Sequence, residues 1–199
     1  MSVGFPDSVA GIARMDFRSI RRSPVVLGVV VALCAIVALA FLGSSSVHPE
    51  PVRTTWGFSA LVAWVVPLLL APLSYLAIAG DRGRGTITYY LGLPNSRGAY
   101  FLAKYATRAG VAVVAVGASV AVAVVVAVAT YEAGPDLARF AVFGVLSVLC
   151  ALAFVGVFLA ISAGTASRSR AMFGVFGAYF LLSAFWVGFL PVLNLGTVL

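Results

Sequence analysis

The chain has 199 residues, of which 62% are hydrophobic and only 10% are charged, and its mean hydropathy is +1.11. Because soluble domains carry about 25% charged residues, this composition excludes an ordinary soluble domain and predicts an integral membrane protein. The net charge of +7 does not indicate nucleic-acid binding. Eleven of the 13 Lys and Arg residues fall in three segments that would share one side of a membrane, as the positive-inside rule expects of the cytoplasmic side.

Residues 9–22 predict an amphipathic helix before the first membrane span. On a helical wheel, four arginines share one narrow arc and apolar side chains lie opposite. These arginines are Arg14, Arg18, Arg21 and Arg22. Asp16 falls on the apolar side and breaks the pattern. We expect this helix to lie in the membrane interface with its arginines toward lipid headgroups; an ordinary juxtamembrane tail is the alternative.

Five stretches without Asp, Glu, Lys or Arg exceed the ~20 residues that a helix needs to cross a bilayer. The predicted spans are 24–42, 56–80, 105–130, 140–163 and 172–193. A β-barrel would alternate apolar and polar residues, and these runs do not. The predicted fold class is therefore all-α, a polytopic transmembrane helical bundle of five spans in a single domain, residues 1–199.

Two prolines, Pro67 and Pro72, lie inside the second predicted span. Each proline lacks an N–H and leaves a backbone carbonyl without its helical partner, so we expect a kink. Neighbouring membrane helices can supply donors to the freed carbonyls.

Side chains suited to catalysis are scarce in the predicted spans. Cys34 and Cys150 lie in apolar runs and are interpreted as core residues rather than as a disulfide or metal pair. The only histidine, His48, falls in a predicted external loop. An intramembrane enzyme needs a nucleophile with a base, or metal ligands, at membrane depth. The sequence predicts no catalytic residue, metal or cofactor, and loss of activity on mutating His48 would revive the enzyme alternative.

The polar segment 81–104, between the second and third spans, is longer than a simple connection needs. Thr86 can cap a short helix from Ile87 to Leu93, and Pro94 ends it because the residue before proline disfavours helix. Asn95 or Ser96 can cap the next helix, which runs into the third span. A capped, amphipathic helix between two spans is suited to contact a cytoplasmic partner. The residues expected at this contact are Thr86, Ile87, Tyr90, Leu91, Pro94 and Arg97.

Residues of this segment resemble the ABC-type-2 transporter permease family. The matching positions are Asp81, Gly85-Thr86, Leu91, Leu93, Pro94-Asn-Ser-Arg97 and Lys104. The amphipathic N-terminal helix looks like the family's elbow helix, and the basic loop 164–170 fits its layout. The resemblance implies the membrane subunit of an exporter, in which a separate cytoplasmic ATPase hydrolyses ATP and holds the helix from Ile87 to Leu93 as a coupling helix. The chain itself lacks the Gly-x-x-x-x-Gly-Lys-[Ser/Thr] phosphate loop.

The chain differs from the family pattern in two ways. The acid at Asp81 is usually Glu, and the family usually has six spans with both termini inside, so we expect either a truncated product or a bundle completed by another polypeptide. The expected topology places the N-terminus and 81–104 in the cytoplasm and Leu199 outside the cell membrane. A second permease subunit, identical or related, is an expected partner. The alternative function is a structural or assembly subunit of another membrane complex.

Overall fold

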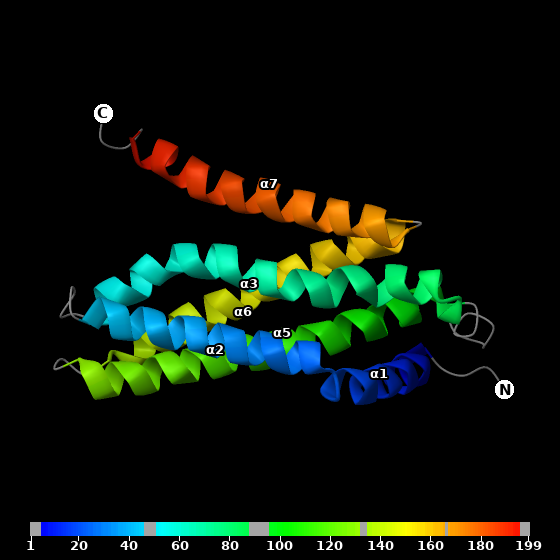
Figure 1. The fold of residues 1–199 in the computed structure, drawn as a ribbon, viewed down its shortest axis with the longest axis horizontal. Coiled ribbons are helices and arrows are strands. Elements are labelled where there is room, and N and C mark those ends of the chain that lie inside the picture. The colour runs from blue at the N-terminus through cyan, green and yellow to red at the C-terminus, as the bar shows by residue number, and fades with distance from the viewer. Residues whose placement is uncertain (1–4, 46–50, 88–95, 132–134, 166, 196–199) are drawn as a thin grey trace.

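The computed structural model describes residues 5–45, 51–87, 96–131, 135–165 and 167–195, with side chains from Val62 onward in α3 and up to Ala184 in α7. Within these ranges all regular structure is helical, which confirms the predicted helical bundle. The helices are α1 (Phe5–Arg21), α2 (Pro24–Ser45), α3 (Pro51–Gly83), α5 (Arg97–Thr130), α6 (Leu137–Gly164) and α7 (Arg168–Leu195) (Figure 1).

Four helices in the described part of the chain, α2, α3, α5 and α6, are long and apolar enough to cross a membrane. Their best windows have mean hydropathies between 2.1 and 3.2. The helix α7 covers the fifth predicted span, and that span stays a prediction. The third predicted span is part of a longer helix, because α5 begins at Arg97 and runs for 34 residues. At 1.5 Å per residue this is about 50 Å, longer than the ~30 Å of a hydrocarbon core, so one end of α5 extends beyond it.

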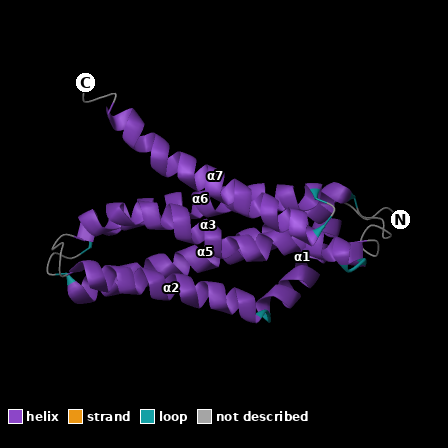
Figure 2. Ribbon diagram, turned by 45° about the horizontal axis from the view of Figure 1, so that its top comes forward, coloured by secondary structure: helices purple, strands orange, loops and turns teal. Residues whose placement is uncertain are grey.

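The bundle core forms where α2 and α6 pack against α3 and α5. Small side chains on α5 let its neighbours approach closely: Ala112, Ala115 and Ala127 are fully buried. On α6, a Cβ at Gly144 would lie only 3.3 Å from the Val120 side chain of α5. The helix α7 packs on α3 and α6 over its first half and then diverges from the bundle, as both ribbon views show (Figures 1 and 2).

Side chains of α6 and α7 bond to the backbone of α3. The Ser183 hydroxyl donates to the Ala63 carbonyl at 3.3 Å, which is the carbonyl that Pro67 leaves free, and Tyr179 donates to the Trp64 carbonyl at 3.0 Å. A neighbouring helix thus satisfies this carbonyl, as the sequence predicted. Farther along α3, the Ser162 hydroxyl enters the helical ladder: it donates to the Tyr75 carbonyl at 2.8 Å and accepts from the Ala79 N–H at 3.0 Å.

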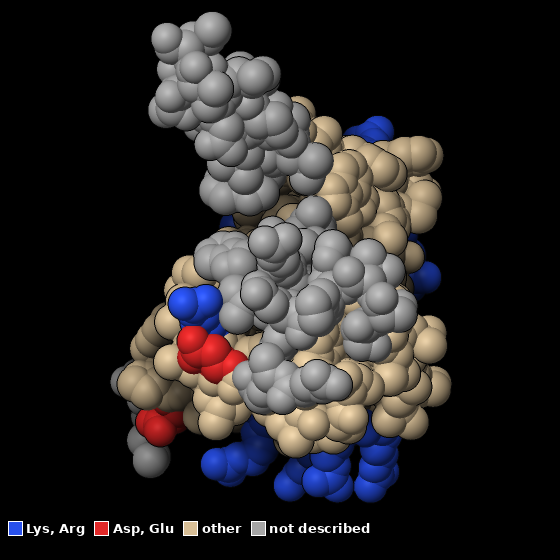
Figure 3. All heavy atoms as spheres, turned by 90° about the vertical axis from the view of Figure 1, so that its left-hand side faces the viewer, with Lys and Arg blue, Asp and Glu red and all other residues tan. Residues whose placement is uncertain are grey.

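Positive charge gathers at one end of the molecule. We call it the basic end: it comprises α1 and its junction with α2, the last turns of α3 with the turn that follows, the first turns of α5, and the α6–α7 connection with the first turn of α7. It holds eleven of the 13 Lys and Arg residues. Figure 3, which looks from the opposite end, shows Lys and Arg side chains projecting along the lower edge of the molecule. This grouping agrees with the predicted distribution of charge.

Candidate functional site

The N-terminal helix α1 turns one buried stripe toward α5. This stripe repeats every fourth residue and consists of Ser8, Ile12, Asp16 and Ile20. Three arginines of α1 and Arg22, which directly follows the helix, are exposed. Asp16, the one acid on the apolar face of the predicted helix, therefore lies in the stripe that packs on the bundle. Its burial requires charged partners from another helix, because an isolated buried carboxylate is strongly unfavourable.

Lys104 of α5 supplies that partner and links two acids from different helices. Its Nζ lies 2.6 Å from Asp16 Oδ1 of α1 and 2.8 Å from Asp81 Oδ2 of α3. All three residues are buried, with 4%, 8% and 6% of their surface exposed. A single cation thus joins α1, α3 and α5 at the basic end.

Asp16 has two further partners on α5. Its Oδ2 accepts a hydrogen bond of 2.6 Å from the Thr107 hydroxyl and forms an ion pair with Arg108. The Arg108 guanidinium also donates to the Leu73 carbonyl of α3 at 3.1 Å. Burial opposes ionisation of Asp16, but the charges of Arg108 and Lys104 and the hydrogen bonds outweigh it and hold the pKa of Asp16 below its ordinary value of 3.8.

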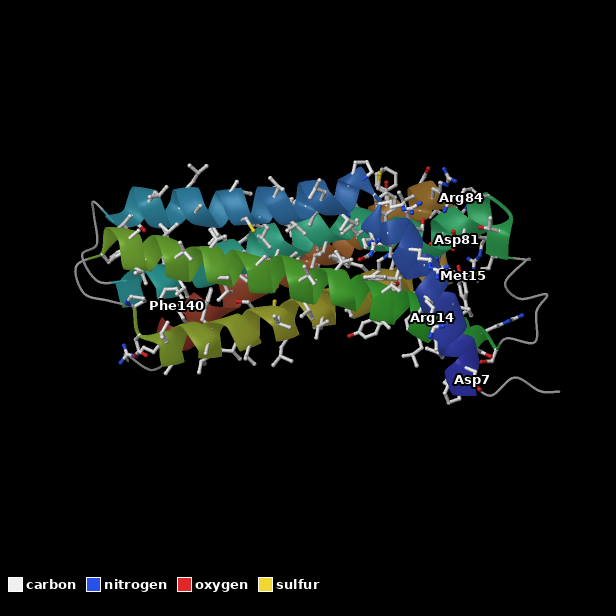
Figure 4. All side chains as sticks on the ribbon, turned by 90° about the horizontal axis from the view of Figure 1, so that it is seen from below. Asp7, Arg14, Met15, Asp81, Arg84 and Phe140 are labelled. Atoms are coloured by element: carbon white, nitrogen blue, oxygen red, sulfur yellow. The ribbon has the colours of Figure 1, made fainter. Side chains whose placement is uncertain are left out.

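Asp81 is the second acid of the cluster and lies in the last turn of α3. Its Oδ2 accepts a hydrogen bond of 2.7 Å from the Tyr100 hydroxyl, and its Oδ1 lies 2.9 Å from the Arg84 guanidinium. The Arg84 side chain is largely exposed, so Lys104 is the buried cation beside this carboxylate. Figure 4 shows Asp81, Arg84 and Met15 at the end of the bundle that α1 crosses.

The backbone after α3 turns sharply at Gly85, whose φ is +74°. This left-handed conformation favours glycine at a helix C-terminus, which explains the glycine of the Gly85-Thr86 pair. Thr86 is already helical, and its hydroxyl donates to the Asp81 carbonyl at 3.1 Å. Its predicted capping role would involve the N–H groups of residues 88 and 89, which lie outside the described residues.

Some of the predicted partner-contact residues lie outside the described part of the chain, and the others lie at the basic end of the bundle. Tyr90, Leu91 and Pro94 lie outside the described residues. Ile87 packs partly buried against the bundle, in a cluster with Ile12 and Tyr100.

Arg97, the last of these predicted residues, is exposed at the start of α5. Ser96 caps that helix by accepting from the Ala99 N–H at 3.1 Å, which confirms one of the two predicted caps.

Arg82 connects the last turn of α3 to the end of α6. Its guanidinium donates to the Ala163 carbonyl at 3.1 Å and to the Thr165 carbonyl. These carbonyls lie at the C-terminus of α6, where a cation also complements the helix dipole. Because Arg82 follows Asp81 in the last turn of α3, α6 is attached to the same end of α3 as the cluster around Lys104.

Several members of this cluster were missed at the level of sequence. Asp16 is recognisable in the sequence as an acid on an apolar helix face, but the sequence does not predict which residue pairs with it. In the sequence Arg108 only adds to the charge expected on the cytoplasmic side, and Tyr100 and Thr107 give no signal because a hydroxyl beside an apolar run has no periodic signature. Lys104 was recognised only as part of a motif.

The fold and the cluster around Lys104 together define a polytopic helical membrane protein. At its basic end, buried ion pairs join α1, α3 and α5. The family described as ABC-2 family transporter protein matches residues 10–197, nearly the whole chain. The chain therefore belongs to the ABC-2 transporter family, which confirms the resemblance and makes it a membrane transport component. A comparison with curated proteins finds no match.

Proposed function

We propose that this chain is the permease subunit of an ABC exporter and that a separate cytoplasmic ATPase subunit drives it. The family match supports the transport role. The eleven basic residues at one end support a cytoplasmic position for that end, including the N-terminus, in the cell membrane. The elbow role of α1 is supported by its exposed arginines and its buried contact with α5.

The Lys104 bridge is the observation that carries the coupling proposal. The segment between α3 and α5 is anchored on one side by Asp81 and Thr86 and on the other by the Ser96 cap. Because Lys104 joins the end of α3 to α5 and α1, a displacement of this segment would move three helices together. A partner acting on residues 86–97 would therefore act on the membrane helices and not on an isolated loop.

A second permease subunit completes the proposed transporter. Large apolar side chains are exposed on several helices, as shown by Leu39 at 68%, Val125 at 67% and Phe173 at 72%. Lipid or another permease can cover such surfaces. Crosslinking in native membranes is expected to trap a permease pair, whereas a strictly monomeric permease in a complex that retains its ATPase would contradict this part of the proposal.

Leu91→Asp tests the docking of the ATPase. The change places a charge in the predicted apolar contact, and an unpaired charge buried at an interface costs several kcal/mol. The co-expressed ATPase recovered by pull-down should bind at least about a hundredfold more weakly. Leu137→Asp is the matched control, because Leu137 is 64% exposed and starts α6 at the opposite end.

Both variants should insert into the membrane at equal levels. Undiminished recovery of the ATPase with Leu91→Asp, at matched expression, would show that this segment is not the docking site. Purification of the native chain with no ATPase at all would instead favour the alternative of a structural subunit.

A further inference from the structure

Two adjoining cavities lie between the α1–α2 junction, α3 and α5. The first has a volume of about 300 Å³, at the lower end of the range of ligand pockets, which is about 300–1,000 Å³. The second has about 200 Å³ and begins where the first ends. The two share Ser19, Ile20, Leu76 and Arg108 in their walls, so they form one continuous cleft.

The walls of this cleft change from polar to apolar along its length. Charged and hydroxyl-bearing side chains line the first cavity, among them Asp16, Ser19, Asp81, Arg84, Lys104 and Arg108. Ser19, Ser23 and Arg108 also line the second cavity, and the rest of its wall is mainly aliphatic. That aliphatic wall includes Val25, Val26, Leu73, Leu76 and Val111. A ligand that fits both cavities has a polar end and a hydrocarbon chain.

The charge of the cleft favours a negative polar end. Three cations, Arg84, Lys104 and Arg108, face two carboxylates within the walls. Two more cations stand at its edge. Arg18 is exposed on α1, three residues after the wall residue Met15, and Arg22 is exposed in the turn after α1, next to the wall residue Ser23. Residues three apart are neighbours on a helix surface.

Hydrogen-bond donors are available beside this charge. Ser19 and Ser23 line the cleft, and neither hydroxyl has a hydrogen-bond partner among the described residues. Phosphate oxygens accept strongly from hydroxyl and guanidinium donors. A free phosphate would use this end alone, whereas the aliphatic walls of the second cavity stabilise a bound ligand only if it carries a chain.

We propose that this cleft binds one anionic phospholipid. The phosphate lies among Ser19, Ser23 and Arg108 with Arg18 and Arg22 at the edge, and one acyl chain follows Leu73, Leu76 and Val111 along α3 and α5. Such a lipid joins the α1–α2 junction to α3 beside the Lys104 bridge. The site does not depend on the proposed ATPase.

The test uses the full chain in mild detergent, with bound lipids counted by native mass spectrometry during titration. Phosphatidylglycerol is expected to bind at one site about tenfold more tightly than phosphatidylcholine, since juxtamembrane cations favour anionic lipid. Glycerol phosphate, which has the headgroup charge and no chain, is expected not to displace it. Equal affinity for the two lipids, or displacement by glycerol phosphate, would overturn the proposal.

Two charge-matched variants separate a site from general attraction. Arg18→Gln/Arg22→Gln removes the two cations at the edge of the cleft, whereas Arg14→Gln/Arg21→Gln removes two exposed cations of α1, neither of which stands three residues after a wall residue. The first variant should lose about tenfold in affinity for phosphatidylglycerol and the second less than about threefold. Equal losses would show attraction of lipid to the arginine surface only and would overturn the site. All four positions are exposed, so both variants are expected to fold.

Discussion

The two ends of the bundle are held together by different interactions. At the basic end, Lys104 joins three helices through buried ion pairs. At the opposite end, Phe41 of α2 packs against Phe140 of α6 at 5.9 Å between ring centroids, and against Tyr131, which follows α5, at 6.5 Å. Figure 4 shows Phe140 at the end far from Asp81.

This contrast has a physical consequence. Aromatic packing is short-ranged and weakens gradually when one ring is truncated. A buried ion pair behaves differently, because removing one partner leaves the other charge uncompensated in a poorly solvated place. The basic end is therefore the more sensitive of the two to single substitutions and the better place for a partner to alter the arrangement of helices.

Lys104→Met should have the largest effect. It removes the buried cation beside Asp81 and one of the two beside Asp16, and breaking a buried pair costs about 3–5 kcal/mol. We expect a strong loss of thermal stability, measured in detergent by size-exclusion chromatography after heating. Arg97→Met, the same kind of change at an exposed position of α5, should shift the midpoint little. Equal shifts for the two variants would contradict the structural role of Lys104.

Phe41→Ala should have a smaller effect at the opposite end. The side chain is 1% exposed. In a membrane the transfer from water contributes little, since lipid is as apolar as the protein interior, so the cost is mainly that of the cavity, about 2 kcal/mol. Leu39→Ala is the control, because Leu39 lies on the same helix and is 68% exposed. A loss larger than that of Lys104→Met would reverse the proposed order of the two ends.

The pH dependence of the α1 contact follows from Asp16. Because its folded pKa is lowered below 3.8, its ionisation contributes stability above that value, and the contribution is lost as pH falls through the folded pKa. The contact of α1 with α5 should therefore stay constant between about pH 5 and 8 and weaken only below about pH 4. Protease protection of the α1–α2 junction over this range would measure it. Weakening between pH 5 and 7 would indicate a carboxyl group with a raised pKa instead.

Ser162→Ala should have the smallest effect. The Ser162 hydroxyl occupies the α3 ladder between Tyr75 and Ala79, and hydrogen bonds between membrane helices contribute about 0.6 kcal/mol on average. We expect a small but measurable decrease in the thermal midpoint. Ser147→Ala should leave it unchanged within error, since among the described residues that hydroxyl bonds only to the Phe143 carbonyl of its own helix. Identical midpoints for the two variants would count against a contribution from the Ser162 bridge.

The features that could be predicted are those that local sequence determines. Runs of apolar residues set the helices, the missing N–H of Pro67 indicated a carbonyl that needs a donor, and the hydroxyl of Ser96 indicated a cap. Each depends on residues at most a few positions apart. The gathering of charge at one end followed because consecutive spans alternate in direction.

The Lys104 bridge could not be predicted in the same way. Asp16 and Lys104 are 88 positions apart, so their contact depends on how α1 turns at Ser23 and crosses α5. Asp81 and Lys104 were both recognised as motif residues, yet a motif does not state that two of its members form an ion pair. Packing between helices, which decides such pairs, has no counterpart in composition or periodicity.

The most direct test of the Lys104 bridge is the stability of Lys104→Met combined with Asp81→Asn. The double variant removes the buried carboxylate that Lys104→Met leaves without its buried cation. The amide oxygen introduced by Asp81→Asn can still accept from Tyr100, and Arg108 still pairs with Asp16. Replacing all charges of a buried pair is often nearly neutral, whereas removing one is costly. We predict that the double variant regains most of the thermal stability that Lys104→Met loses. A double variant less stable than Lys104→Met alone would contradict the account.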